Sequence, residues 1–369
     1  MNDQQTQNCQ NAAELIVPAE AVTAEFATKP IGIAEVCDRL EHASSILLLT
    51  HTRPDADTLG SAFALRELLR ALGKTCEVIN DDDIPKRLKF IFGVDSLLPD
   101  TLPDGFSPDL IVSVDISASK LLGALEPESG ARDDVAVDHH ALGTPFAAET
   151  CMVPVGACGE IICDIAKEFK RRGHPVMNRA AASALYAAIC SDTGSFKFDS
   201  VTPETHMRIA DLLEYGINHA EIARRLYDSR PVSQVRATGI AICALKFYCG
   251  GKLALINFTK KMREDNNLTR EDIDDIISLT RSIEGVEVGM SIKQSDDDET
   301  LYKVSMRSNR VADVSQLCAK FGGGGHKRAS GCTLNAGSPD EAESTLVAVV
   351  SAELEVLMSE GAFDGADKV

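Results

Sequence analysis

Acidic and imidazole side chains directly follow several short apolar stretches of this chain, at residues 45–50, 110–114 and 135–137. One more acid follows a helical pattern at 180–190. The side chains in question are His51, Asp55, Asp57, Asp115, Asp138, His139, His140 and Asp192. If they meet in one place, so many carboxylates repel one another unless cations lie between them. The pattern therefore predicts a site for two divalent metal ions.

The residue types also indicate which metals would bind. Carboxylate oxygens suit Mg²⁺ or Mn²⁺, and imidazole nitrogens favour Mn²⁺ or a similar transition ion. Two simpler interpretations stay open at this point. The acids at positions 55 and 57 are also typical of a turn that only caps the following helix. His139 and His140 are also compatible with ordinary surface positions, although Asp138 is placed to orient one of the two imidazoles.

The elements that must position these side chains alternate between strand-like and helix-like patterns from residue 31 to 226. The predicted strands are 46–49, 76–79, 110–114 and 135–137. The predicted helices are 59–72, 160–172, 178–190 and 203–215. Such alternation is typical of an α/β domain with a parallel sheet. Because ligands bind beyond the carboxyl ends of the strands in an open parallel sheet, the acids and histidines are expected to converge there.

The pattern changes after residue 226. A linker is expected at 227–240, followed by a smaller α+β domain at 241–358. The predicted elements of this second domain are strands at 253–258, 286–292 and 301–306 and helices at 314–321 and 345–358. Residues 1–30 lack convincing periodicity and are expected to form a mobile tail, and residues 359–369 a C-terminal tail.

Four consecutive glycines at 322–325 precede His326 and follow a predicted helix. Glycines let a backbone approach a ligand closely or form a nest for an anion, although a flexible loop between a helix and a strand has the same composition. Arg307 and Ser308 end the preceding predicted strand, and arginine binds phosphate through two parallel hydrogen bonds. We therefore expect Arg307 and His326 to hold one end of a phosphorylated ligand.

Composition limits the possible classes of protein. No apolar stretch reaches the ~18 residues of a membrane span, and no signal peptide is recognisable. The net charge of −19 argues against wrapping long nucleic acid. The 11 cysteines form no close pairs, which favours a reducing cytoplasm over a disulfide framework. Cys158, Cys163 and Cys190 are expected in the core, and the acids at 81–83 in a solvated loop.

Taken together, these motifs resemble the DHH phosphoesterase superfamily. The matching segments are 51–61, 114–115, 138–140 and 192–196, and the segment 321–331 is similar to the signature of the DHH-associated domain. The resemblance covers residues 31–355 and includes the motifs in order. Ala56 and Thr58 replace the commoner Gly and Ala of the first motif, and Ser330 stands where Ala is usual. None of these three is a ligand position, so the departures bear on substrate preference only.

The resemblance implies a site and its residues. Two ions, Mn²⁺ with Mg²⁺ or Co²⁺ as alternatives, would be held in the cleft between the two domains. One would be bound by His51 and Asp55, the other by Asp57, His139 and Asp192, with Asp115 bridging them and His140 contacting the phosphate or protonating the leaving group. The residues expected to bind substrate are Arg307, Ser308, Gly323, Gly324, Gly325 and His326.

Within the superfamily, length and layout most resemble the branch of nanoRNases and pAp phosphatases. This implies hydrolysis of short oligoribonucleotides to mononucleotides and of adenosine 3′,5′-bisphosphate to AMP. The alternatives are a cyclic dinucleotide or linear diadenylate phosphodiesterase, a RecJ-like single-strand exonuclease and a non-catalytic nucleotide sensor. The expected partners are short RNA or small nucleotides, with neither long duplex nucleic acid nor a membrane. A homodimer and a cytoplasmic location are also expected.

Overall fold

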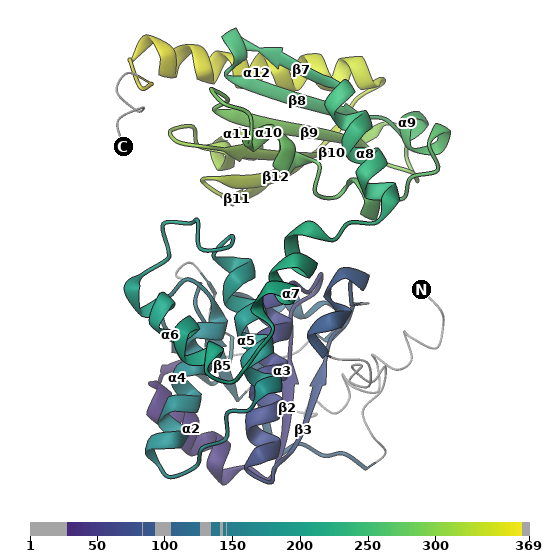
Figure 1. Ribbon diagram of the computed structural model, residues 1–369. Coiled ribbons are helices and arrows are strands. Elements are labelled where there is room, and N and C mark those ends of the chain that lie inside the picture. The colour runs from purple at the N-terminus through teal and green to yellow at the C-terminus, as the bar shows by residue number, and fades with distance from the viewer. Residues whose placement is uncertain are drawn as a thin grey trace, which may run out of the picture. The chain divides into compact units, whose positions relative to one another are not determined.

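The computed structural model describes residues 28–82, 84–92, 105–125, 134–140, 143, 144 and 146–363. Contacts divide the chain into two compact units, of which the first ends at Ser229 and the second begins at Arg230 (Figure 1). Most of the expected N-terminal tail and the last residues of the chain lie outside the described residues. The same is true of Asp83 in the expected solvated loop. Within the described part, no helix has the length and apolar character needed to cross a bilayer.

The first unit contains a six-stranded sheet in the order β1-β6-β5-β4-β2-β3, with every neighbouring pair parallel. Its strands are β1 (Lys29–Pro30), β2 (Ser45–Leu49), β3 (Thr75–Ile79), β4 (Leu110–Val114), β5 (Val135–Asp138) and β6 (Glu149–Met152). The predicted parallel α/β fold is confirmed, and the four predicted strands correspond to β2, β3, β4 and β5. The two strands at the β1 side of the sheet were not predicted: β6 has a single buried residue, Cys151, and β1, at the edge, lies in the expected tail.

Alternating side chains of the strands divide the core of this unit between the two faces of the sheet. Ile46 and Leu48 of β2 pack in the larger cluster with helices, whereas Leu47 and Leu49 pack in a smaller cluster on the other face. The helices of this unit are α2 (Ile33–His42), α3 (Ala56–Ala71), α4 (Cys158–Arg171), α5 (Arg179–Asp192), α6 (Pro203–Leu213) and α7 (His219–Ala223). Further helical turns lie at Lys86–Phe92, Ser119–Leu125 and Arg224–Asp228.

Helices α3, α4 and α5 approach one another closely because two glycines lie at their contacts. A Cβ on Gly60 would lie 2.6 Å from the Ala184 carbonyl oxygen, and one on Gly159 would lie 2.9 Å from the Cβ of Ala188. These three helices carry the acids or the N–H groups of the site described below. The close approach therefore fixes those groups relative to one another.

The second unit contains a mixed six-stranded sheet in the order β11-β12-β10-β9-β8-β7, which is antiparallel except for the β8–β9 pair. Its strands are β7 (Leu245–Tyr248), β8 (Leu253–Phe258), β9 (Val288–Gln294), β10 (Leu301–Ser308), β11 (Gly324–His326) and β12 (Ala329–Asn335). Its helices are α8 (Val232–Cys243), α9 (Lys260–Asp265), α10 (Ile277–Arg281), α11 (Val314–Ala319) and α12 (Pro339–Ser359), with short helical turns at Cys249–Gly251 and Glu271–Ile273.

Two parts of this unit differ from expectation. Most of the expected linker at 227–240 is helical, because α8 begins directly after Pro231 and buries Ala237 and Ala241 against the unit. Helix α12 begins at Pro339 rather than at residue 345, since the Ser338 side chain accepts a hydrogen bond from the Glu341 N–H and so caps its first turn. A proline at the first position of a helix leaves no N–H unpaired.

Candidate metal centre

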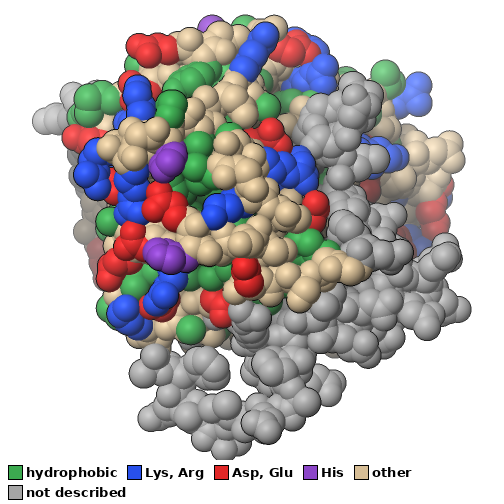
Figure 2. All heavy atoms as spheres, turned by 90° about the horizontal axis from the view of Figure 1, so that it is seen from below, with side chains coloured by type: hydrophobic (Ala, Val, Ile, Leu, Met, Phe, Trp, Pro, Cys, Tyr) green, Lys and Arg blue, Asp and Glu red, His purple; other side chains and the backbone are tan. Residues whose placement is uncertain are grey.

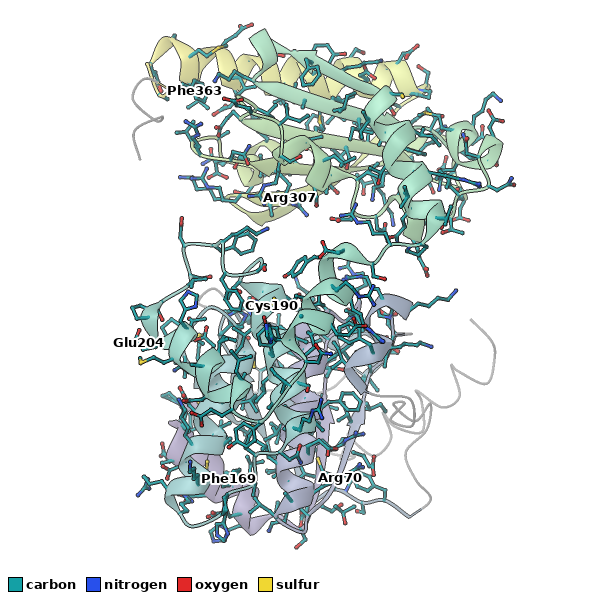
Figure 3. All side chains as sticks on the ribbon, viewed as in Figure 1. Arg70, Phe169, Cys190, Glu204, Arg307 and Phe363 are labelled. Carbon is teal, nitrogen blue, oxygen red and sulfur yellow. The ribbon has the colours of Figure 1, made fainter. Side chains whose placement is uncertain are left out.

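The structure brings the predicted acids and histidines of the first unit together at the carboxyl ends of β2, β4 and β5 and at the end of α5. Three groups of side chains have ligand atoms that all lie within 4.8 Å of one another. These groups are His51 with Asp55 and Asp115, Asp57 with His139 and Asp192, and Asp115 with His139 and His140. Figure 3 labels Cys190 on α5, two residues before Asp192. Seven of the eight residues expected to converge here are therefore neighbours, and the eighth, Asp138, contacts His140.

Asp115 faces two of these groups with its two oxygens. Its Oδ2 lies 3.8 Å from Nε2 of His51, and its Oδ1 lies 3.4 Å from Nε2 of His139. The carboxylate is buried, and Oδ1 has no hydrogen-bond partner among the described residues. A buried carboxylate oxygen without a donor is costly unless a cation compensates it. The residue also has a φ of +63°, a conformation that aspartate tolerates better than most residues.

Backbone carbonyls orient both imidazoles that face Asp115. Nδ1 of His51 lies 2.8 Å from the Thr52 oxygen, and Nδ1 of His139 lies 3.0 Å from the Val155 oxygen. A carbonyl only accepts hydrogen bonds, so each Nδ1 must carry the proton in the neutral ring. The lone pair of each Nε2 then points toward the carboxylates. Metal-binding histidines are held in this way.

The two acids of the first motif are fixed by helix N-termini. Asp55 caps α3, since its Oδ1 accepts hydrogen bonds from the N–H groups of Asp57 and Thr58. The helix-capping interpretation therefore holds for Asp55, and it leaves room for ligation because each oxygen accepts more than one contact. Asp57 accepts hydrogen bonds from the N–H groups of Cys158 and Gly159 at the start of α4. The Ser61 hydroxyl donates to the same carboxylate.

The loop that carries His51 is held by residues that follow β3, among them one of the acids expected in a solvated loop. The Asn80 amide donates to the His51 oxygen, and Oδ2 of Asp82 accepts a hydrogen bond of 2.6 Å from the Arg53 N–H. Asp81 accepts a hydrogen bond from the N–H of Ala124. Asp81 and Asp82 do lie in a partly exposed loop, and they also hold neighbouring backbone, which was not predicted. The sequence contained a sign of this role, because these acids, like the acids of the site, follow the end of a predicted strand.

The pKa values of the site reflect crowded charges in a buried place. Burial and the charge of Asp115 raise the pKa of Asp192 to about 6, and the same two causes hold that of Asp57 well above its usual range. Burial lowers the pKa of His51, but Asp55 raises it more, so that it reaches about 9. Burial likewise opposes the effect of Asp115 on His139, whose pKa reaches about 10. Divalent cations would replace these protons and relieve the repulsion.

His140 belongs only to the third group, with Asp115 and His139, and it lies beside the other two groups. Its Nδ1 is 2.7 Å from Oδ1 of Asp138, and its ring packs 4.4 Å from that of His139. The hydrogen bond with Asp138 raises the pKa of His140 against the effect of burial. The expected orienting role of Asp138 therefore concerns His140, whereas a backbone oxygen orients His139.

The predicted substrate-binding residues lie in the second unit, around β10 and β11. Arg307 pairs with Ala329 of β12, and Ala329 pairs with the backbone of His326, so the three positions form one row across the sheet. Figure 3 labels the partly exposed side chain of Arg307. Burial and the nearby Arg281 hold its pKa below the usual range. Ser308 is buried, and its hydroxyl contacts the Lys327 oxygen at 3.4 Å.

Two positions of the Gly-rich loop have no room for a Cβ. A Cβ on Gly323 would lie 2.3 Å from the Gly331 oxygen, and Gly325 has a φ of +141° with the Ala329 oxygen 2.7 Å from the place of a Cβ. Gly324, which pairs with Gly331, has open space instead. The glycines therefore serve the close packing of β11 on β12 as well as any approach of a ligand.

Comparison with known proteins assigns both units. The model of the DHH family N-terminal domain matches residues 45–189, and that of the DHHA1 domain matches residues 251–355. The bifunctional oligoribonuclease and PAP phosphatase NrnA of Thermus thermophilus is 30% identical over 87% of this chain and 93% of its own. The chain belongs to the DHH family of phosphoesterases. DHH-family enzymes use divalent metals, which the three groups of histidines and acids fit.

Two further proteins are similar over most of this chain. The protein of the same name from Bacillus subtilis is 26% identical over 86% of this chain and 95% of its own. A solved structure of an exopolyphosphatase-related protein from Bacteroides fragilis superposes with a TM-score of 0.77 at 25% identity, covering 88% of this chain and 96% of that one.

Thr58, one of the departures from the family pattern, donates a hydrogen bond to the Val114 oxygen and so joins α3 to the end of β4.

Proposed function

We propose that this DHH phosphoesterase hydrolyses short oligoribonucleotides to mononucleotides and adenosine 3′,5′-bisphosphate to AMP at a site that holds two divalent cations, most suitably Mn²⁺. The observation that carries the proposal is the position of Asp115 between two ligand groups, with a different oxygen facing each. The relatives named bifunctional oligoribonuclease and PAP phosphatase support the choice of substrates.

The roles follow from the groups. His51 and Asp55 would hold one ion and Asp57, His139 and Asp192 the other, and Asp115, whose oxygens lie near both groups, would contribute to both sites. Bound there, two divalent cations stabilise charge on a phosphoryl group and lower the pKa of a bound water. The carboxylates must be ionised and the imidazoles neutral to act as ligands. The carbonyls of Thr52 and Val155 favour the neutral tautomer that leaves Nε2 free.

His140 is the group that we assign to the proton and the phosphate. Asp138 stabilises its protonated form, so it serves as a cationic donor to a phosphate oxygen or to the leaving oxygen. Its partly exposed side chain is accessible to substrate in a way that the buried Asp115 is not. A phosphate or nucleoside away from the bond that is cut would be bound by the second unit. The residues assigned to this contact are Arg307, Ser308, Gly323, Gly324, Gly325 and His326.

A substrate panel tests this function. With Mn²⁺, we expect hydrolysis of RNA dimers to pentamers and release of phosphate from adenosine 3′,5′-bisphosphate. Cyclic di-AMP, linear diadenylate and a 24-mer RNA belong in the same panel because they represent the rival activities. Preferred turnover of the cyclic dinucleotide or of the 24-mer would contradict the proposal, and no turnover of any substrate with two bound ions would favour a sensor.

A further inference from the structure

The carboxylate of Glu160 is the most buried acid outside the three ligand groups of the first unit. It lies in the first turn of α4 and is 1% exposed. Its Oε1 accepts a hydrogen bond of 3.0 Å from the Gly156 N–H. Its Oε2 accepts one of 3.0 Å from the Thr205 hydroxyl and one of 3.0 Å from the Arg208 guanidinium. One acid thus joins the loop before α4 to helix α6.

Gly156 lies between two contacts that orient ligands. The residue before it, Val155, provides the oxygen that orients the His139 ring. Two residues after it, the N–H of Cys158 begins the pair of hydrogen bonds to Asp57. A shift of Gly156 therefore moves the partners of both His139 and Asp57.

Asp192, the third residue of the group formed with Asp57 and His139, is also connected to Gly156. A Cβ on Gly156 would lie 3.3 Å from Cγ2 of Thr193 and 3.2 Å from the Ser200 oxygen. Thr193 directly follows Asp192 and ends α5. The loop that Glu160 holds is thus packed against the turn that carries Asp192.

The other group of ligands is supported by different contacts. Asn80 and Asp82 hold the loop of His51, and Asp55 is fixed by the N–H groups of its own helix. The N–H of Asp115 donates to the Val137 oxygen of the neighbouring strand. None of these contacts involves Glu160 or Gly156.

We propose that Glu160, paired with Arg208, is a positioning residue for one cation only, the one held by Asp57, His139 and Asp192. This inference rests on the proposed two-cation function. The physical reason is that a buried carboxylate bonded to a guanidinium, a hydroxyl and a backbone N–H fixes the loop in one place, and groups that orient metal ligands tune the affinity of the site. The cation held by His51 and Asp55 does not depend on it.

Calorimetric titration of the whole chain with Mn²⁺ tests this assignment without an activity assay. The substitution Glu160→Gln keeps the size but turns an amide N–H toward one of the three donors. It is introduced into two backgrounds: Asp55→Asn, which weakens the first ion site and keeps a helix cap, and Asp192→Asn, which weakens the second. We expect Glu160→Gln to weaken Mn²⁺ binding about 10- to 100-fold in the Asp55→Asn background and to leave it unchanged in the Asp192→Asn background.

Two further variants keep the test decisive. Gly156→Ala adds one methyl group against Glu160, Ser200 and Thr193, and it is expected to act in the same background only, so it decides the matter if Glu160→Gln does not fold. Glu343→Gln is the matched control, a buried carboxylate of the second unit that is held by Lys246, Tyr248 and Asn257. It should change neither titration.

The outcomes separate this inference from the proposed function. Equal weakening in both backgrounds would mean a general structural role, and no weakening in either would mean no role in binding; each result overturns the inference and leaves the two-cation site standing. Binding of fewer than two ions by the unsubstituted chain would overturn the two-cation function itself, and the inference with it.

Discussion

Nε2 of His139 lies 3.4 Å from Oδ1 of Asp115, a buried oxygen that no hydrogen bond reaches from the described residues. The Nδ1 atom of the same ring is hydrogen-bonded to the Val155 oxygen. Any rotation of the ring that turns Nε2 away from the carboxylate would break this hydrogen bond. A cation bound by both atoms would compensate the unpaired oxygen of Asp115 and would use the free lone pair of the His139 Nε2.

Replacing Asp115 with asparagine should abolish most activity. The change keeps the size of the side chain and tolerates the positive φ, so the fold should survive, but it removes the charge shared by the two ligand groups. Changing a residue that only orients a ligand already costs about 10- to 100-fold in metal affinity or activity, so a loss of kcat of at least ~100-fold is expected. Metal analysis with steady-state kinetics checks this, and near-normal turnover with two bound Mn²⁺ would refute the bridging role.

The affinity for Mn²⁺ should rise with pH. In the metal-free protein the pKa of His51 is about 9 and that of His139 about 10, so at neutral pH both rings carry a proton that the cation must displace. Raising the pH toward these values removes that cost, so binding tightens and fewer protons are released. Titration calorimetry in two buffers of different ionisation enthalpy measures the released protons. Binding that is independent of pH between about 6 and 9 would contradict the ligand assignment.

Arg307→Ala should weaken substrate binding while leaving the metals in place. Loss of a charge-assisted hydrogen bond to phosphate is expected to cost about 1.5–3 kcal/mol, seen as a lower kcat/KM. His326→Ala should act in the same direction. Lys303→Ala is the control, because Lys303 lies on the same strand, four residues away, and is exposed. If either of the first two variants lost its metal ions, the assignment of these residues to substrate would be wrong.

The strands that carry the site were predictable because each is a short apolar stretch with an Asp or a His at or just after its end. Val112 and Val114 are buried and lead straight into Asp115. Strand β6 escaped prediction because Glu149 and Thr150 are polar and only partly buried. Helix α8 escaped because a Ser-Arg-Pro segment precedes it and because its Val232 and Val235 are exposed.

The candidate ligands could be selected from their residue types, and the structure brings them together. The contacts that hold them in place could not be predicted. The oxygen that orients His139 and the N–H groups that bind Asp57 belong to the backbone of residues 155, 158 and 159. Any residue type has a backbone oxygen and any but proline a backbone N–H, so no side-chain pattern points to these contacts. Glu160 carries a side chain but looks like an ordinary first-turn acid of a helix until its partners on α6 are known.

Two glycine substitutions in helices should have opposite effects on stability. Gly60→Ala places a Cβ 2.6 Å from the Ala184 oxygen and forces α3 away from α5, which should destabilise the first unit by about 1–3 kcal/mol. Gly239→Ala lies on α8 with nothing within 4 Å, so the better helix propensity of alanine should stabilise the second unit by about 1 kcal/mol. Thermal unfolding of both variants compares the effects. Equal behaviour would mean that the α3–α5 contact is looser than described.

Substrate length separates the proposed activity most sharply from that of a RecJ-like exonuclease. The net charge is −19, and on the face that Figure 2 shows, the described acidic and basic side chains are interspersed without a continuous basic track. With this net charge, each further nucleotide of a longer strand is expected to add repulsion rather than phosphate contacts. We expect kcat/KM for a dinucleotide to exceed that for a 24-mer in Mn²⁺. Raising the salt concentration should narrow the difference, because it screens the repulsion of the longer strand. A ratio below one would favour an exonuclease that processes long strands, even if every metal ligand proves correct.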